Sequence, residues 1–422
     1  MPTEAPYDYI IVGSGIAGLY MATELLRLSP RPRVAIYEKH AEVGGRVYTF
    51  HKEINGIEMQ WEGGAGRISE EHTIIMGLLK RYKLTWSPIG GGVQYKDTYD
   101  SQLEPNAFEP AIPIYLETIA GLPAEDLAQH TIRELLTKVH GPVRAENYLI
   151  RFPYRAEIDV MRADAALDLF RRDLGGAAKY GVCVEGLSAL TGAMRKDIEK
   201  RGGKFHMEHK LVRITKEEAV FIHEGDEVRS SARHYILALT SEAISHVKQF
   251  ENWETLKHLR MTPLLRFYGS FPKDDDGKIW YENFGGRIVT ATPVRYIIPG
   301  NPANGSMHMS YTDTQDAQFW IDKLNTDGEK KVGEEMLAEL RKLLRPSIPP
   351  PRFVKAHAWA HGVTYWLPGN YSPKELSKGA LTPFPKELPA VHVCGESFSL
   401  RQGWMEGAVE HAAALLKKIG KK

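Results

Sequence analysis

A glycine-rich turn near the N-terminus constrains the fold of this chain more than any other feature. The segment YDYIIVGSGIAGLYMATELLRL has an apolar run at residues 9–12, then Gly13, Gly15 and Gly18, and then apolar residues at helical spacing. A second apolar run, RPRVAIYEKH, ends at Glu38. This order predicts a strand, a tight turn, a helix and a second strand, and therefore an α/β unit with parallel strands.

Each glycine has its own role if the turn binds a dinucleotide. Gly13 permits the tight turn, Gly15 lets the backbone approach a pyrophosphate, and Gly18 lets the helix pack closely on the strand. The helix N-terminus faces the phosphate charge, and Glu38 is placed to accept hydrogen bonds from the adenosine ribose. A lone glycine turn is weak evidence, but here strands, helix and acidic residue agree, so we predict a Rossmann-like dinucleotide site.

A second glycine turn separates the candidate cofactors. Gly44, Gly45 and Arg46 follow directly after the strand that ends at Glu38. A simple NAD site has no use for such a turn, whereas FAD requires further contacts along its pyrophosphate and ribityl chain. We therefore predict FAD, with Gly45 and Arg46 among the residues that bind it.

The rest of the chain alternates between strand patterns of the nucleotide unit and two long insertions. Helix and strand patterns return in VEGLSALTGAMRKDIEKRGGKFHMEHKLVRI and HYILALT, and a last buried strand lies in LPAVHVCGESF. We predict a discontinuous FAD-binding domain made of residues 1–70, 180–250 and 385–422. Residues 71–179 and 251–384 would form an interleaved α+β substrate-binding domain.

Composition excludes several classes of function. The 54 basic and 53 acidic residues nearly cancel, which disfavours nucleic acid or an anionic membrane as partner. Two cysteines without metal-ligand spacing disfavour a disulfide scaffold and a metal site, and no segment has the length of a membrane span. We expect a cytoplasmic protein with a small-molecule ligand. Its oligomeric state stays open, although homodimers are the commonest assembly.

The segment GESFSLRQGWMEGAVEHA, far from the first glycine turn, reads as a second half of the cofactor site. Glu396 follows the last strand and is placed to reach the ribityl or pyrophosphate region, and Gly403 allows a tight turn. A helix is predicted to start near Trp404, with its N-terminus toward the flavin ring. Its buried stripe is expected to contain Val409, Ala412, Ala413 and Leu416.

Taken together, these motifs resemble the FAD-dependent amine oxidase superfamily, which includes flavin monoamine oxidases and L-amino-acid oxidases. The fold implied is a discontinuous Rossmann-like domain of the GR2 type. A narrower likeness, to bacterial L-tryptophan oxidases of the violacein pathway, rests on GAGR (64–67), PLLRF (263–267), YTDT (311–314), WAHGV (359–363) and GWMEG (403–407).

The narrower likeness implies roles for individual residues. Arg67 would bind the substrate carboxylate in bidentate fashion, and the Tyr311 hydroxyl would contact the same group. Tyr148, His361 and Trp404 would line the substrate pocket, and Val212 and Met405 would join the cofactor contacts. Arg266 stands where most relatives have a lysine near the flavin. It keeps the charge but cannot accept a proton.

The segment WAHGVTYW departs from amine-specific relatives, because His361 and Gly362 stand where those relatives have a flavin-linked cysteine and a cage tyrosine. We therefore expect non-covalent FAD. The resemblance implies oxidation of an aromatic or bulky apolar L-amino acid by hydride transfer from Cα, with oxygen as co-substrate and a 2-oxo acid, ammonia and hydrogen peroxide as products. Two alternatives stay open: an oxidase of carboxylate-free amines or a desaturase-type relative, and a flavin-binding protein of low turnover.

Overall fold

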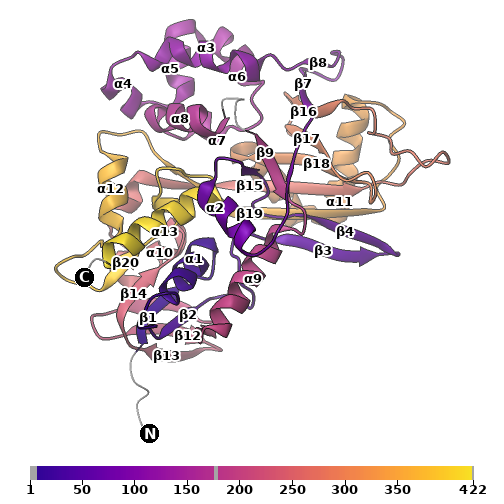
Figure 1. The fold of residues 1–422 in the computed structure, drawn as a ribbon. Helices are drawn as coiled ribbons and strands as arrows, with labels where there is room; N and C mark the ends of the chain where they lie inside the picture. The colour runs from indigo at the N-terminus through magenta and orange to yellow at the C-terminus, as the bar shows by residue number, and fades with distance from the viewer. Residues whose placement is uncertain (1–6, 175–178, 421–422) are drawn as a thin grey trace.

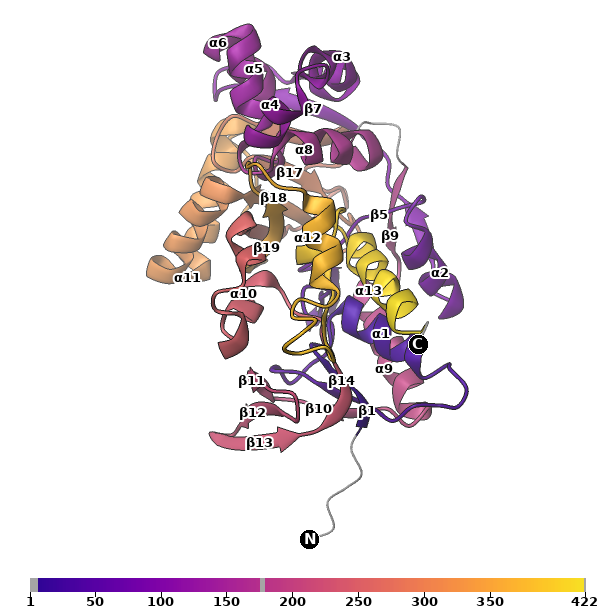
Figure 2. The ribbon, with the colours of Figure 1, turned by 90° about the vertical axis from the view of Figure 1, so that its left-hand side faces the viewer.

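The computed structural model describes residues 7–174 and 179–420 of the chain. Three layers of structure are visible in Figure 1: a parallel sheet with helices at the bottom, a large mixed sheet beside helix α11, and a group of short helices at the top. Figure 2 shows the same arrangement from the side, with the helical group above both sheets. The mixed α/β class predicted from the glycine turns is confirmed.

The parallel sheet has five strands in the order β10–β2–β1–β14–β20. All four pairings are parallel, and the central strand β1 pairs with β2 on one side and β14 on the other. The strands come from three separated parts of the chain: β1 (Tyr7–Val12), β2 (Val34–Tyr37), β10 (Lys204–His206), β14 (Ala232–Leu237) and β20 (Val391–Val393). The exact boundaries of the two domains stay a prediction.

Helices and a small sheet cover the two faces of the parallel sheet. Apolar side chains of one face pack against α1 (Ile16–Leu25), α9 (Leu187–Lys200) and α13 (Met405–Ile419). Those of the other face pack against α10, α12 and the antiparallel strands β11–β13. These elements are α10 (Ser241–Ser245), α12 (Pro373–Ala380), β11 (Lys210–Ile214), β12 (Ala219–His223) and β13 (Asp226–Ser230).

The buried stripe of α13 differs in part from the one predicted. Val409 and Ala412 are fully buried as expected, but Ala413 and Leu416 are only partly buried. The stripe instead continues through Leu415 and Ile419. At its C-terminal end the predicted stripe differs from the observed one by one residue, Leu416 in place of Leu415, because an alanine-rich helix has several nearly equivalent apolar faces.

The mixed sheet has seven strands in the order β19–β15–β18–β17–β16–β7–β8, and all pairs are antiparallel except β16 with β7. One face packs on helix α11 (Thr314–Leu343), which is interrupted at Gly328. The strands are β7 (Gly92–Lys96), β8 (Glu104–Pro105), β15 (Leu259–Ser270), β16 (Gly286–Thr290), β17 (Tyr296–Pro299), β18 (Ser306–Asp313) and β19 (Phe353–Trp366).

The helical group packs on the same sheet through Tyr95 and Tyr296, which belong to its apolar cluster. Its second-longest helix begins with a reciprocal cap between Thr131 and Glu134. The members are α3 (Phe108–Ala120), α4 (Ala124–Gln129), α5 (Ile132–His140), α6 (Pro142–Leu149), α7 (Ala156–Asp159), α8 (Ala163–Leu169) and the π-helix η1 (Phe170–Leu174).

Two small antiparallel sheets join the larger parts. The hairpin of β3 (Thr49–Ile54) and β4 (Ile57–Glu62) ends next to the glycine loop of residues 63–66. In the second sheet, β9 (Tyr180–Cys183) lies between β5 (Ile68–Ser69) and β6 (Trp86–Pro88), and α2 (Thr73–Arg81) follows β5. This second sheet brings Tyr180 beside the segment that carries Arg67.

Candidate active site

The first glycine turn has the geometry predicted for pyrophosphate binding. Gly13 has φ +98°, and a Cβ on Gly18 would lie 1.9 Å from the Gly13 carbonyl oxygen. At Gly15 the nearest atom to such a Cβ is 3.9 Å away, so this side of the turn is open. Gly15 caps α1 without a side-chain acceptor for the first N–H groups. An anion can therefore be bound by this helix N-terminus.

Glu38 lies at the end of β2 and is buried. Its Oε2 accepts hydrogen bonds from the Ser14 backbone N–H at 2.8 Å and from the Ser14 hydroxyl at 2.9 Å, and its Oε1 accepts from the His40 N–H at 3.0 Å. The carboxylate is thus fixed beside the glycine turn, at the position that ribose recognition requires.

The structure joins the second glycine turn to the C-terminal segment. Arg46 donates one hydrogen bond to Glu396 at 2.8 Å and another to the Gly362 carbonyl at 2.9 Å. The other oxygen of Glu396 accepts from the N–H of Gly403 at 2.9 Å, and Gly403 has φ +82°. Residues predicted to contact one cofactor from distant positions in the sequence therefore meet, although Glu396 is held by protein donors rather than left free.

The remaining predicted cofactor contacts lie nearby on known elements. Gly45 has φ +59°, and a Cβ on it would lie 3.4 Å from the Cα of Gly15, so the two glycine turns touch. Val212 lies at a bulge of β11, where the register with β12 shifts between Leu211 and Arg213. Met405 is the first residue of α13 and packs in the core below the parallel sheet.

Arg67 is enclosed by aromatic rings. Its guanidinium carbon lies 5.4 Å from the ring centres of Tyr154 and Tyr180 and 5.7 Å from that of Trp404. It donates a hydrogen bond of 2.8 Å to the Tyr154 hydroxyl. Burial alone would lower the pKa of Arg67, but the nearby tyrosines, Tyr154 foremost, raise it, so the group stays cationic. Among the described residues, no carboxylate is within ion-pair distance of this guanidinium.

Arg266 is a buried guanidinium that shares the neighbours Tyr154 and Tyr311 with the partly buried Arg67. It lies on β15, donates to the Glu62 carbonyl at 3.1 Å and to the Tyr311 hydroxyl at 3.4 Å, and lies 4.6 Å from the Tyr311 ring centre. Its Nε is buried without a hydrogen-bond partner in the part of the chain described. Because β15 pairs with β18, Arg266 and Tyr311 are directly opposite each other in the sheet.

The predicted pocket residues separate into two groups. Trp404 stacks on Tyr180 at 5.6 Å beside Arg67, and Tyr311 meets Tyr154 edge to face at 5.5 Å. The roles of both residues toward a substrate stay predictions. Tyr148 belongs to the same apolar cluster, but its ring contacts are with Tyr115 and Phe108.

His361 does not join this group. Its side chain is 53% exposed, and its Nε2 lies 3.9 Å from the Glu242 carboxylate of α10. None of these contacts brings His361 to Arg67, and its place in the substrate pocket stays a prediction.

Sequence reasoning missed several residues of this site. Tyr154 and Tyr180 complete the rings around Arg67, and neither lies in a recognisable motif. Near Arg266, the ring of His308 lies 4.0 Å from that of Tyr268 at a tilt of 38°, and burial followed by the charge of Arg266 lowers the pKa of His308 well below the usual value. Such contacts could be found only from the fold, since the residues come from separate elements.

A buried ion pair holds the segment before Trp404. Arg401 donates to Asp173 of η1 through its Nε at 2.9 Å, and His72 lies 3.5 Å from the same carboxylate. Burial would raise the pKa of Asp173, but hydrogen bonds from His72 and Arg401 lower it. The His72 ring also lies 5.1 Å from Trp404, edge to face. Trp404 is thus held between the edge-to-face contact with His72 and the stacked ring of Tyr180.

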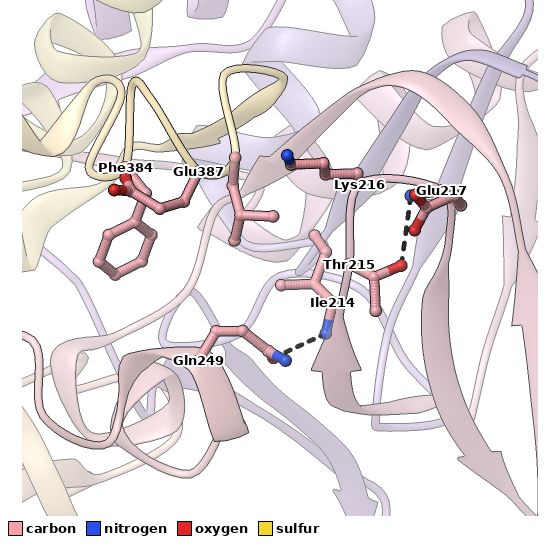
Figure 3. Close-up of a pocket in the computed structure, with 8 residues that line it drawn as sticks. Ile214, Thr215, Lys216, Glu217, Gln249, Phe384 and Glu387 are labelled. Atoms are coloured by element: carbon pink, nitrogen blue, oxygen red, sulfur yellow. Dashed lines mark hydrogen bonds between the residues drawn. The ribbon is translucent and has the colours of Figure 1, made fainter.

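Two surface hollows lie away from these residues. One of about 520 Å³, drawn in Figure 3, lies between the β11–β12 turn and the loop before β20, where Gln249 accepts a hydrogen bond from the Ile214 N–H at 3.0 Å. None of the predicted site residues lines it. Within residues 7–174 and 179–420, no group of His, Cys, Asp and Glu side chains could hold a metal ion. No described helix is long and apolar enough to span a membrane.

Comparison with solved structures supports the fold. A putrescine oxidase bound to putrescine superimposes with a TM-score of 0.75 at 16% identity, covering 99% of this chain and 100% of that one. Cyclohexylamine oxidase from Brevibacterium oxydans IH-35A gives a TM-score of 0.73 at 19% identity, again over 99% and 100% of the two chains. At these identities the likeness establishes a shared fold.

Two curated proteins are similar in sequence. "Putative L-amino-acid oxidase YobN" of Bacillus subtilis strain 168 is 21% identical over 99% of this chain and 96% of its own length. "Lysine-specific histone demethylase 1 homolog 2" of Oryza sativa subsp. japonica is 39% identical over 84 residues, which is 19% of this chain and 10% of that protein. The first match therefore spans both chains, whereas the second is local.

A family model settles the class of protein. The model described as flavin containing amine oxidoreductase matches residues 16–414, nearly the whole chain. The open turn at Gly15, the uncapped N-terminus of α1 and the fixed Glu38 fit the pyrophosphate and ribose of FAD. This chain therefore belongs to the flavin-containing amine oxidoreductase family and is an FAD-dependent enzyme of that class.

Proposed function

We propose that the enzyme oxidises L-amino acids with aromatic or bulky apolar side chains. The observation that carries this proposal is Arg67, a cation enclosed by three aromatic rings and without an anionic partner in the described part of the chain. Arg67 is partly buried, and a charge withdrawn from water in this way is costly unless it is paired. The carboxylate of an amino acid would provide the missing partner and could accept two parallel hydrogen bonds from the guanidinium.

The surroundings of Arg67 also suit an apolar side chain. Tyr154, Tyr180, Tyr311 and Trp404 present ring surfaces around the guanidinium, and large rings bury much apolar area at small entropic cost. The likeness of WAHGV and YTDT to bacterial L-tryptophan oxidases of the violacein pathway favours an aromatic substrate in particular. YobN, similar over nearly the whole chain, is described as an amino-acid oxidase.

In this proposal the protein positions the substrate, and the cofactor accepts the electrons. FAD, when bound, supplies the hydride acceptor for the Cα hydrogen, and molecular oxygen restores it with release of hydrogen peroxide. Arg67 binds the carboxylate, the Tyr311 hydroxyl lies on the same side, and Arg266 adds a fixed positive charge. Water converts the released imino acid to a 2-oxo acid and ammonia.

We further propose that FAD is held without a covalent bond. The segment WAHGV has no cysteine, and Cys183 and Cys394 are both buried in the apolar cluster that packs between the parallel sheet and α1, α9 and α13. Acid precipitation of the holoenzyme should therefore leave the flavin in the supernatant. Flavin that stays with the precipitated protein would contradict this.

Oxidation of carboxylate-free amines is the main alternative, and the putrescine and cyclohexylamine oxidases that share the fold favour it. Substrate pairs that differ only in the carboxylate separate the two. We expect peroxide from L-tryptophan and L-phenylalanine, and on the order of 10²-fold lower kcat/KM with tryptamine and 2-phenylethylamine, because Arg67 would be left unpaired. Putrescine and cyclohexylamine complete the panel. The reverse order of activities would refute the amino-acid proposal.

A further inference from the structure

A buried carboxylate oxygen without a partner lies close to the residues around Arg67. Glu157 is on α7, which Figure 1 shows below the other short helices and above the strands of the mixed sheet. Its Oε1 accepts a hydrogen bond of 3.0 Å from the Tyr365 hydroxyl of β19. Its Oε2 is buried and, in the described residues, has no hydrogen-bond donor. This oxygen can accept a proton or a hydrogen bond from a ligand.

The position of Glu157 is fixed from two directions. Asp313 of β18 accepts hydrogen bonds from the N–H groups of Arg155 at 2.9 Å and Ala156 at 3.3 Å, which ties the start of α7 to the mixed sheet. Three residues before Glu157, the Tyr154 hydroxyl accepts the hydrogen bond from Arg67. One short segment therefore contacts Arg67 with one residue and presents a free carboxylate oxygen with another.

The charges that face Glu157 come from three elements. Burial and, to a smaller extent, the negative charge of Asp313 on β18 raise its pKa to about 7. The hydrogen bond from Tyr365 on β19 and the positive charge of Arg67 act in the opposite direction. Asp313 itself has a pKa raised to about 6 by burial. Glu157 is thus poised to gain or lose a proton near neutral pH.

We propose that Glu157 Oε2 binds the ammonium group of the substrate and takes one proton from it. The N–H bond breaks, its electron pair stays on nitrogen as a lone pair, and the proton forms a bond to Oε2. No oxidant takes part in this step. Hydride transfer from the adjacent carbon requires a neutral amine, so the step prepares the substrate for oxidation. Together, Arg67 and Glu157 would bind both charges of a zwitterion.

The pairing of Arg67 and Glu157 rests on the proposed function, but the proton transfer requires only an amine. The amino-acid proposal and the proton transfer to Glu157 can therefore be refuted separately. If tryptamine reduces the flavin and L-tryptophan does not, the amino-acid proposal fails while Glu157 can still be tested on tryptamine. If L-tryptophan reduces the flavin and Glu157 has no effect, only the present inference fails.

The experiment measures anaerobic reduction of the bound flavin between pH 6 and pH 10 in holoenzyme variants. In Glu157→Gln the amide cannot accept the proton, so we expect reduction about 10²-fold slower than wild type at pH 7. The variant should recover as pH rises, because the amine is then deprotonated in solution. The matched control is Asp159→Asn, on the same helix, whose carboxylate is paired with Arg133. It should reduce within about twofold of wild type.

A binding measurement gives a second readout that does not depend on turnover. α-Methyl-L-tryptophan has no Cα hydrogen and cannot be oxidised, so its Kd can be measured on the oxidised holoenzyme. We expect Glu157→Gln to raise this Kd at pH 8 by roughly tenfold or more, through loss of the ion pair with the ammonium group. Asp159→Asn should leave it unchanged.

Other outcomes would overturn the inference. A pH profile of Glu157→Gln parallel to that of wild type would mean that another group takes the proton. Unchanged Kd for α-methyl-L-tryptophan would mean that Oε2 does not meet the ammonium group. If Glu157→Gln does not retain FAD, the Tyr365→Phe variant is measured instead. Loss of the 3.0 Å hydrogen bond from Tyr365 to Glu157 should shift the pH profile of flavin reduction to higher pH. A profile unchanged in that variant would equally refute the role of Glu157.

Discussion

The two ends of the active site satisfy their polar groups in different ways. At the nucleotide end, Glu38 accepts hydrogen bonds from Ser14 and His40, and Arg46 is paired with Glu396. At the substrate end, Arg67 has no anionic partner within the described chain, and Glu157 keeps one oxygen free. The first region is organised by its own residues before it meets a ligand. The second region holds charges that only a ligand can pair, and this is where specificity is expected to lie.

The substitution with the largest expected effect on the difference between the two ends removes the unpaired cation of Arg67. Arg67→Met should lower kcat/KM for L-tryptophan by about 10³-fold, roughly 4 kcal/mol, because the substrate carboxylate would be buried without its partner. The effect on tryptamine should be small. Arg151→Met is the control, since Arg151 also lies over a tyrosine ring, that of Tyr95, but is already paired with Glu104. Equal losses of kcat/KM with L-tryptophan and with tryptamine would mean that Arg67 stabilises the fold rather than recognising the substrate carboxylate.

At the nucleotide end, the corresponding change is steric. Gly18→Ala would place a Cβ 1.9 Å from the Gly13 carbonyl, so the turn must open, at a cost of about 3 kcal/mol. We expect a lower flavin-to-protein ratio after purification and a lower urea midpoint. Gly192→Ala on α9 is the matched control, because nothing lies within 4 Å of its added Cβ. It should be neutral or stabilising by a few tenths of a kcal/mol.

Glu62 lies between the nucleotide end and the substrate end of the active site. Replacing it tests, through the pH dependence of stability, how well the protein itself satisfies a carboxylate at this position. Burial raises its pKa to about 7 from 4.5, against hydrogen bonds from Leu187 and Thr49 and the charge of Arg266. Since the pKa is higher in the folded state, its contribution to stability is complete below pH 4.5 and is lost as pH rises through 7. Glu62→Gln should therefore be more stable than wild type at pH 8, by roughly 1–3 kcal/mol, in urea unfolding.

The control for this change lies on the same strand. Glu58 is 62% exposed and lies 2.9 Å from His51 of β3, so Glu58→Gln should change the free energy of unfolding by less than about 1 kcal/mol at either pH. If Glu62→Gln is destabilising at both pH values, the hydrogen bonds to Leu187 and Thr49 outweigh the cost of the buried charge.

The smallest expected effect comes from replacing Trp404, whose ring lies where the nucleotide end and the substrate end of the active site meet. Trp404 caps α13, whose first turn faces the cofactor region, and its indole lies 5.7 Å from the Arg67 guanidinium. Trp404→Ala should lower kcat/KM by about tenfold through loss of this contact, with FAD content unchanged. Trp404→Phe should recover most of the activity. Loss of flavin in Trp404→Ala would assign the ring to the cofactor site instead.

The sequence carried more information about the nucleotide end than about the substrate end. Gly13, Gly18 and Glu38 act through local backbone geometry, which fixed spacing along the chain already encodes. The rings of Tyr154 and Tyr180 reach Arg67 from separate elements, so no spacing could indicate them. The fold was predictable for the same reason, because its strands and glycine turns are local signals.

Two points that the sequence did not settle have equally physical causes. His361 precedes Gly362, whose carbonyl accepts a hydrogen bond from Arg46, but the direction of a single side chain on β19 depends on register, and the His361 ring lies near Glu242. In α13, the choice between Leu415 and Leu416 as core residue depends on which neighbours cover the helix. Both questions are decided by tertiary packing rather than by local pattern.

The order of strands in the parallel sheet has a consequence for biosynthesis. β1 and α1 emerge from the ribosome first, but α13, which packs against α1, and the edge strand β20 are made long afterwards. Until then the apolar face of the early β1–α1–β2 unit lacks its cover, and contacts so distant in sequence form slowly. We therefore expect FAD to bind late in folding, after α13 has packed on α1 and Glu396 has paired with Arg46, and we expect the flavin-free chain to be more sensitive to proteolysis than the holoenzyme.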